Sequence, residues 1–217
     1  MAKITHKLFL LILSIFVCCH TCKADVFPLS CDKIPKQTIG LYQADRRIEI
    51  YSKPDIKAKV LYDSLIDYSK YNDSKTDTTF AVMIPKKELA FLFVTNISDD
   101  EEWVEIIYDK QNNKKGWIYK NDDFQFMPWH HFINLYGRKY GLSQLIKTPS
   151  EYKNVYSAPD RNSQILGKIQ GARAIRLTAI EGYWMLVTAV DYDGEIITGY
   201  IQWRDDEGNI FIFPVLK

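Results

Sequence analysis

The sequence has no hydrophobic stretch long enough to span a membrane, no marked excess of either charge and few cysteines. Its main apolar run, Leu8–Val17, covers ten residues, whereas a transmembrane helix needs about 20. The 28 lysine and arginine residues are balanced by 27 aspartate and glutamate residues. Because it has no basic stripe and no basic amphipathic helix, the chain is predicted to bind neither nucleic acid nor a membrane surface as its main role.

The short apolar run has the flanks of a secretory signal. Lys3 and Lys7 form a positive region before it, and a small residue, Ala24, follows it. We predict a signal peptide over residues 1–24 and an exported protein in the periplasm or outside the cell. Cleavage after Ala24 removes three lysines and no acid, which leaves a charge of 25 − 27 = −2. The alternative interpretation is a buried N-terminal helix.

Most of the cysteines lie near the N-terminus. Of the four cysteines, Cys18, Cys19 and Cys22 lie in the predicted signal peptide, so only Cys31 would remain and no intrachain disulfide could form. One alternative is a lipoprotein anchored through Cys18 or Cys19, although Val17 stands where a lipobox normally has a small residue. Another is a longer mature form with a Cys22–Cys31 disulfide.

An internal repeat covers most of the chain after the apolar run. Four segments recur in the same order, which predicts two copies of one structural unit, at residues 36–123 and 133–217. The paired segments are Tyr51–Asp55 with Tyr156–Asp160, Val60-Leu61 with Ile165-Leu166, Trp103–Ile106 with Trp184–Val187, and Gly116–Asp122 with Gly199–Asp205.

The repeated segments have the patterns of short strands and turns. Apolar and polar residues alternate in Ile48–Tyr51, which is the period of a half-buried strand. Pro54 and Pro159 fix φ and lack an N–H, so each is expected in a turn after the first strand. Hairpin tips are expected at Gln111–Lys114 and Asp191–Gly194. The fold class predicted from these signals is all-β, with two small barrels.

The first copy is longer than the second. Tyr51 and Trp103 are 52 positions apart, whereas Tyr156 and Trp184 are 28 apart. The additional residues fall in Tyr62–Lys87, which is predicted to be a long loop. Loops of that length are often functional, so the segment is either a tolerated surface insertion or a binding loop.

The segment between the copies, residues 124–133, is too apolar for a free linker. We predict a strand, then a turn or helix that begins at Pro128, and then entry into the second copy. The two barrels are therefore expected to pack against each other at this segment.

The order of the motifs resembles that of the bacterial SH3-like (SH3b) family. That family has a strand, an S-x-P turn, an apolar strand, a G-x-W-x-x-V strand and a closing G-(Y/W)-(V/I) strand. The second copy follows this pattern at Tyr156–Pro159, Ile165–Gly167, Gly182–Val187 and Gly199–Ile201, and the first at Tyr51–Pro54, Val60-Leu61, Trp103–Ile106 and Gly116–Ile118.

The resemblance implies two tandem SH3-like barrels, the first with a long loop insertion, that act as an envelope-facing binding module. Such modules commonly accompany peptidoglycan enzymes and hold them near cell-wall peptides. Tyr51 and Tyr156 depart from the family, which often has arginine at this position. The signature of eukaryotic SH3 domains for proline-rich peptides is absent, and no wall-cutting domain accompanies the repeats.

The sequence offers no constellation that predicts catalysis, a cofactor or a metal site. His130 and His131 are adjacent, so their side chains diverge in a strand or a helix, and they lack partners at ligand spacing. The acidic clusters Asp99–Glu102 and Asp205–Glu207 are more typical of solvated turns than of paired catalytic carboxylates. We therefore expect a protein that is not an enzyme and has no cofactor or metal.

The candidate ligand-binding residues are aromatic residues at the repeated segments. Core packing is their alternative role, but aromatic side chains also give rigid contact area with few rotamers to freeze. The expected function is a non-catalytic exported binding module for peptidoglycan peptides or an envelope protein. The alternative is an inhibitor or immunity-type protein that binds a toxin or hydrolase through the long loop. The candidate residues are Tyr51, Trp103, Tyr156, Tyr183, Trp184 and Trp203.

Overall fold

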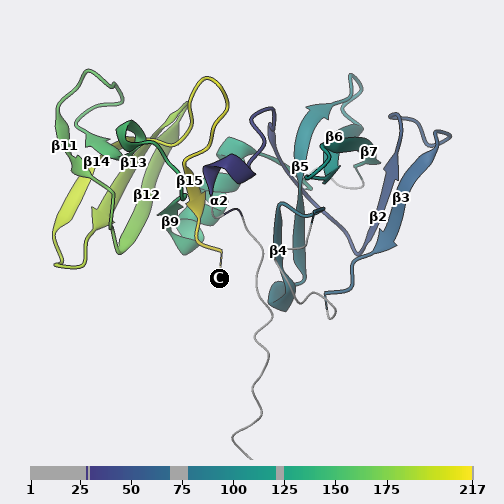
Figure 1. Cartoon of the computed structure of the whole chain (residues 1–217), viewed down its shortest axis with the longest axis horizontal. Coiled ribbons are helices and arrows are strands. Elements are labelled where there is room, and N and C mark those ends of the chain that lie inside the picture. Colours follow the sequence, from purple (N-terminus) through teal and green to yellow (C-terminus); the bar gives the residue numbers. More distant parts are fainter. Residues whose placement is uncertain (1–27, 29, 69–77, 121–124, 217) are drawn as a thin grey trace, which may run out of the picture.

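The computed structural model describes residues 28, 30–68, 78–120 and 125–216. The predicted signal peptide, with Cys18, Cys19 and Cys22, lies outside the described residues, as do residues 69–77 of the predicted loop. The described residues form two antiparallel sheets with the helix α2 (Trp129–Tyr140) between them (Figure 1). The all-β prediction is confirmed. None of the helices in these ranges is both long and apolar enough to cross a membrane.

The first sheet is built from the first repeat. Its strands are β1 (Gly40–Gln43), β2 (Arg47–Tyr51), β3 (Val60–Leu65), β4 (Val82–Ile84), β5 (Leu89–Ile97), β6 (Trp103–Asp109), β7 (Lys114–Tyr119) and β8 (Phe126–Pro128). The hydrogen-bonded order is β3-β2-β7-β6-β5-β1-β8, and β4 pairs with β5 beside this path. Two 3₁₀ helices, η1 (Cys31–Lys33) and η2 (Pro85–Lys87), precede β1 and β5.

The second sheet is built from the second repeat. Its strands are β9 (Leu142–Gln144), β10 (Asn154–Tyr156), β11 (Ile165–Lys168), β12 (Ala174–Glu181), β13 (Trp184–Val190), β14 (Ile196–Gln202) and β15 (Ile212–Pro214), with the 3₁₀ helix η3 (Ser150–Lys153) before β10. The order β11-β10-β14-β13-β12-β9-β15 matches that of the first sheet strand for strand, with β4 as the addition in the first. The repeat in the sequence is therefore a repeat of strand order.

The correspondence extends to the register and its irregularities. Pairing of β2 with β3 shifts between Ile50 and Tyr51, and pairing of β10 with β11 shifts between Val155 and Tyr156. A second shift lies in β5 at residues 94–96 and in β12 at residues 177–179. Such bulges bend a strand and increase its twist. Both sheets are therefore curved at matching points.

Neither path closes on itself over the described residues. β3 and β8 are the two ends of the first path, and β11 and β15 are the ends of the second. The closed barrels implied by the resemblance are thus not seen in the strand pairing, and the SH3-like assignment stays a prediction.

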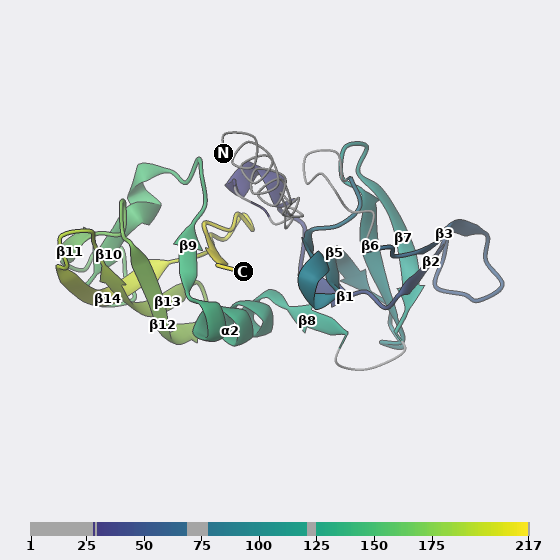
Figure 2. The same ribbon diagram turned by 90° about the horizontal axis from the view of Figure 1, so that it is seen from below.

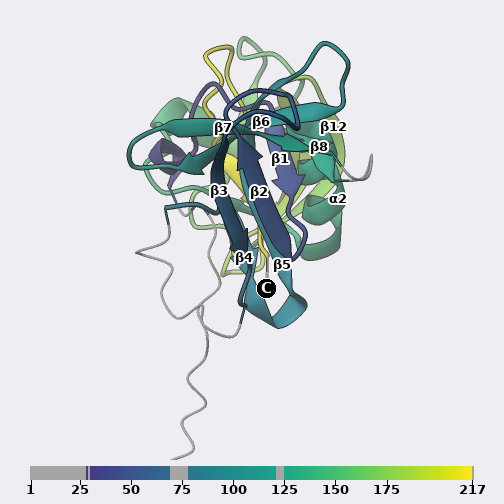
Figure 3. The same ribbon diagram turned by 90° about the vertical axis from the view of Figure 1, so that its right-hand side faces the viewer.

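Two glycines allow one layer of each sheet to cross another closely. Figure 3 shows β2 and β3 running across β6 and β7. A Cβ on Gly116 of β7 would lie 2.4 Å from Cγ2 of Ile50, and one on Gly199 of β14 would lie 2.6 Å from the carbonyl oxygen of Tyr156. Contacts this short require the neighbouring atoms to move, which are the side chain of Ile50 at Gly116 and the backbone of β10 at Gly199. Glycine is therefore required at both crossings.

Helix α2 begins after Pro128, as predicted, and joins the two sheets. Trp129, Phe132, Ile133 and Tyr136 follow the spacing of one face of a helix and are all buried. Helix α2 lies between the sheets (Figure 2), and its apolar face packs in one cluster with residues of both. The ring of Phe132 lies 5.6 Å from that of Phe91 on β5 and 5.6 Å from that of Phe213 on β15, between ring centroids. The expectation that the copies pack together is confirmed.

Polar contacts hold the same junction. The indole Nε1 of Trp129 donates a hydrogen bond to the carbonyl oxygen of Thr38, 3.0 Å away, and Nη2 of Arg204 donates to the same oxygen at 3.4 Å. Lys36 and Glu207 form an ion pair of 2.8 Å, which is exposed to solvent and adds little stability. The buried contacts of Thr38 therefore fix the second repeat against the first.

The predicted loop Tyr62–Lys87 is only partly a loop. Its first residues belong to β3, and Phe80–Ile84 are all buried. Within that stretch, β4 pairs with β5 in the core of the first sheet. The prediction of a surface insertion is wrong for this part, because five consecutive apolar residues lose contact with water when they join the sheet. Deletion of the whole segment would remove a core strand.

Candidate functional site

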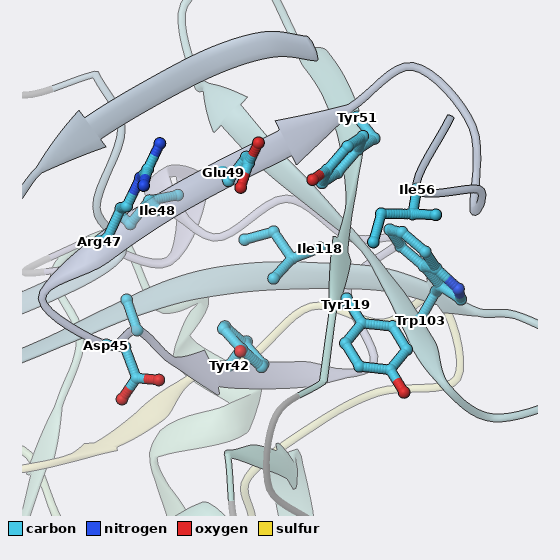
Figure 4. A pocket seen from close by; sticks show the side chains of 11 residues that line it. Tyr42, Asp45, Arg47, Ile48, Glu49, Tyr51, Ile56, Trp103, Ile118 and Tyr119 are labelled. Atoms are coloured by element: carbon cyan, nitrogen blue, oxygen red, sulfur yellow. The ribbon is translucent and has the colours of Figure 1, made fainter. Parts of the chain in front are cut away.

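A groove of about 270 Å³ opens on the first sheet beside the aromatic residues of the repeat (Figure 4). Its floor includes Tyr42 of β1 and Ile118 of β7. Figure 4 shows aromatic side chains at one end of the groove and charged side chains at the other. Strands far apart in the sequence thus supply one concave surface.

Trp103 organises the aromatic end. Its ring lies edge-on to Tyr51 of β2, at 5.4 Å between ring centroids, and edge-on to Tyr119 of β7, at 5.2 Å. Trp103 is 5% exposed and Tyr119 is 44% exposed. Edge-to-face pairs of this kind are favourable. Trp103 therefore serves as a fixed backing, while Tyr119 and the exposed Ile56 form the accessible rim.

Arg47 at the charged end is already paired. Its Nε and Nη2 donate to the two carboxylate oxygens of Asp63, at 2.8 and 2.7 Å. This bidentate hydrogen bond raises the pKa of Arg47 and lowers that of Asp63. The charge of Arg47 is therefore balanced by Asp63, and the carboxylates of Asp45 and Glu49 give this end of the groove an acidic character.

Two tyrosines of the groove, Tyr42 and Tyr51, stay protonated. Burial raises the pKa of Tyr42, whose hydroxyl donates to Oε1 of Gln125 at 2.6 Å. Burial, and after it the hydrogen bond to Glu49, raises the pKa of Tyr51. Both phenols therefore act as neutral hydrogen-bonding groups on a surface that combines aromatic rings with carboxylates.

The second copy repeats the aromatic pair. The rings of Tyr156 and Trp184 lie edge-on at 5.6 Å and 89°, close to the 5.4 Å and 88° of Tyr51 and Trp103. The pairing of Tyr51 with Trp117 across the first sheet corresponds to that of Tyr156 with Tyr200 across the second. Four of the residues predicted from the sequence thus occupy two equivalent positions.

In the second copy, side-chain contacts link the equivalent positions. Arg161 stands at the position of Ile56, and Gln202 at that of Tyr119. The guanidinium of Arg161 lies 4.5 Å from the ring centroid of Tyr152, and its Nε donates to Oε1 of Gln202 at 2.6 Å. Tyr152 in turn stacks on Phe211 at 3.8 Å. These contacts connect residues whose counterparts in the first copy lie around the open groove.

The two remaining predicted residues have different environments. Tyr183 lies at the turn between β12 and β13 and is 45% exposed. Trp203 is buried, and its Nε1 donates to the carbonyl oxygen of Gly182 at 2.9 Å. Trp203 therefore packs in the core of the second sheet, whereas Tyr183 is available to solvent.

Several groove residues escaped the sequence analysis. Tyr119 lies inside a repeated segment, so its aromatic character was a usable signal. Arg47 and Glu49 lie on β2, and Asp45 lies just before it. In the sequence these residues have the pattern of the solvent-facing positions of an alternating strand. Nothing in the local pattern places them beside Trp103, because that proximity depends on the crossing of β2 over β6 and β7.

Other residues singled out from the sequence have local structural partners. His130 is exposed on α2, with Nε2 3.2 Å from the carbonyl oxygen of Ile180. Asp100 accepts a hydrogen bond from the amide of Glu102 at 3.0 Å, as expected for a turn. Asp205 is buried rather than solvated and accepts from the amide of Asn209 at 2.7 Å. Cys31 is a free thiol.

No three histidine, cysteine, aspartate or glutamate side chains gather as metal ligands in the described ranges.

No family model matches the chain, and the curated proteins give no match either. The site is therefore interpreted from its own geometry.

Proposed function

We propose that this chain is a non-catalytic, exported binding protein whose first repeat holds an amino group of a peptide. A cell-wall peptide is the favoured ligand. The observation that carries the proposal is a groove in the first copy where an aromatic wall lies beside two carboxylates, at positions that Arg161 bridges in the second copy.

The aromatic rings and carboxylates of the groove favour a cationic ligand. An ammonium group over an aromatic face gains about 0.5–2 kcal/mol, and a nearby carboxylate adds Coulomb attraction. Asp45 and Glu49 lie within the same groove as Tyr51, Trp103 and Tyr119. A carboxylate ligand is disfavoured, because the guanidinium of Arg47 is held by Asp63.

The size of the groove suits a single side chain or one end of a peptide ligand. Pockets for drug-sized ligands usually measure about 300–1,000 Å³, and this groove measures about 270 Å³. Peptides of bacterial cell walls carry free amino groups on short, flexible side chains, which fit such a space. Binding is the role that the resemblance and the groove both support.

The test is calorimetric titration of the protein with a soluble cell-wall peptide that has a free side-chain amine. Tyr119→Ala removes the accessible ring, and Glu49→Gln removes a charge without a change of shape. Each substitution is expected to weaken binding about three- to thirtyfold, which corresponds to the energy of one cation–π or charged contact. N-acetylation of the peptide amine should weaken binding to the same degree.

Tyr183→Ala is the matched control. Tyr183 is 45% exposed and Tyr119 is 44% exposed, but Tyr183 lies on the second repeat away from the groove. The control should bind like the unsubstituted protein. Equal binding of the acetylated and free peptides, or equal losses in the two tyrosine variants, would contradict the proposal.

A further inference from the structure

A second cleft, of about 650 Å³, lies where α2 ends against the second sheet. Leu142 of β9 and Ile175 and Leu177 of β12 line it, and all three are buried. Val215, near the end of the described chain, adds to the same surface. The floor of the cleft is therefore apolar.

The rim of this cleft carries positive charge from two elements. Two of its cations lie in the last turn of α2, and two lie at the start of β12. The residues that line the cleft include no aspartate or glutamate. None of the ion pairs found among the described residues involves any of the four cations. They are Arg138, Lys139, Arg173 and Arg176.

Arg138 is held in place by uncharged partners. Its Nε donates to Oδ1 of Asn134 at 2.9 Å, and its Nη2 donates to the carbonyl oxygen of Thr178 at 2.6 Å. These contacts orient the guanidinium but leave its charge unbalanced. Its other N–H groups remain as donors for a planar array of acceptor oxygens.

A fifth cation reaches the same region from the first repeat. Nζ of Lys87 lies 3.1 Å from the hydroxyl of Tyr140, which lines the cleft, and 4.2 Å from its ring centroid. Nζ of Lys139 lies 5.2 Å from the same ring. The hydrogen bond from Lys87, and with it the contact of Lys139, lowers the pKa of Tyr140. Both ammonium groups therefore lie beside the phenol of Tyr140.

Helix stabilisation explains only part of this arrangement. Cations in the last turn of a helix offset its C-terminal dipole, which accounts for Arg138 and Lys139. It does not account for Arg176, which lies on β12, or for Arg173, which directly precedes that strand. The chain as a whole has a formal charge of only +1. The positive charge at this cleft is therefore a local feature and does not reflect the charge of the whole chain.

We propose that this cleft binds a phosphate group, with the arginines on its oxygens and the apolar floor against the body of the ligand. Several cations with no acid suit phosphate better than a carboxylate, because phosphate has more acceptor oxygens and a charge beyond −1 near neutral pH. The same chemistry occurs in a phospholipid headgroup and in a soluble phosphate ester.

The test uses the full exported chain labelled with ¹⁵N and titrated with inorganic phosphate at low salt. Amide signals of the cleft, such as those of Gly141 and Ala174, should shift with saturation. The double variant Arg173→Gln/Arg176→Gln should weaken binding at least about tenfold, since each charge-assisted hydrogen bond contributes a large part of that factor. Arg173→Lys/Arg176→Lys keeps the charge and should recover part of the affinity.

The matched control is Lys59→Gln/Lys168→Gln, which removes the same charge from exposed positions beside or on the edge strands β3 and β11. The control should change the affinity for phosphate less than about twofold, because exposed charges far from the cleft are screened. Absence of saturable shifts, or equal weakening in the control and arginine variants, overturns the proposal.

Vesicles distinguish the two sources of phosphate. Sedimentation with phosphatidylglycerol vesicles, but not with phosphatidylcholine vesicles, that is lost in Arg173→Gln/Arg176→Gln assigns the cleft to an anionic lipid headgroup. Saturable phosphate binding without vesicle binding assigns it to a soluble phosphate ester. Both results support the site, and the proposed amine groove is unaffected by either.

Discussion

At the scale of single residues, three exchanges between the copies decide which groove is open. Ile56, Tyr119 and Arg47 of the first copy stand where the second has Arg161, Gln202 and Tyr152. In the second copy Arg161 contacts both Tyr152 and Gln202. In the first, Arg47 turns to Asp63 instead, and the space beside Tyr119 stays accessible.

The pair Arg47–Asp63 predicts a pH effect. Arg47 holds the pKa of Asp63 below its ordinary value of 3.8. A lowered pKa means that the folded state binds fewer protons, so the stabilising contribution is complete above 3.8 and is lost as the pH falls through the folded pKa. Arg47→Gln should therefore return the midpoint of Asp63 to about its ordinary value.

The midpoint is measured by NMR titration of the Asp63 carboxyl carbon in both proteins. Asp100, whose pKa is lowered first of all by the hydrogen bond from Ser98 and not by Arg47, is the internal reference and should have the same midpoint in both. The same midpoint for Asp63 in the two proteins would contradict this interpretation.

At the scale of elements, the crossing of β2 over β7, repeated as β10 over β14, depends on one glycine in each sheet. Gly116→Ala and Gly199→Ala are each expected to destabilise the protein by about 1–3 kcal/mol, the usual effect of overpacking. Gly199→Ala should cost more, because its Cβ would meet backbone, the carbonyl oxygen of Tyr156, at 2.6 Å. At Gly116 the nearest atom belongs to the side chain of Ile50.

Urea unfolding measures these free energies. Ile196→Ala is the control on the same strand as Gly199, since Ile196 is 71% exposed and its truncation should change stability by less than about 0.5 kcal/mol. Glycine variants as stable as this control would show that β2 and β10 can move away from the crossing without cost.

At the scale of the whole molecule, the two sheets share one apolar core through α2. Buried residues of both repeats belong to one continuous cluster, and Phe132 contacts a ring on each side. A second cluster lies within the first sheet alone. The repeats are therefore expected to unfold together rather than as independent units.

Phe132→Ala tests this coupling. It should cost about 3–5 kcal/mol and should reduce amide hydrogen-exchange protection in β5 and β13 by similar factors. Leu135→Ala, on the same helix but 48% exposed, should leave protection in both strands nearly unchanged. Loss of protection in only one of the two strands would show that the sheets open separately.

The sequence alone determined the local features of this protein. Period-two alternation, Pro54 and Pro159 in turns and the polar hairpin tips predicted strands and an all-β fold, because these signals depend on neighbours within a few residues. The repeated order of segments predicted that the two halves share a strand order. A turn or helix that begins at Pro128 was likewise predicted, since proline favours the first turn of a helix, and the structure has the helix.

Only the tertiary structure decided which surfaces are open. The groove brings β2, β6 and β7 together, and the cleft joins α2 to β12, so both depend on contacts between residues far apart in the chain. The burial of Phe80–Ile84 and Trp203 is decided in the same way, by the partners that the sheets supply. A local pattern marks a side chain as aromatic or charged, but its neighbours in space determine whether it packs, pairs or stays available to a ligand.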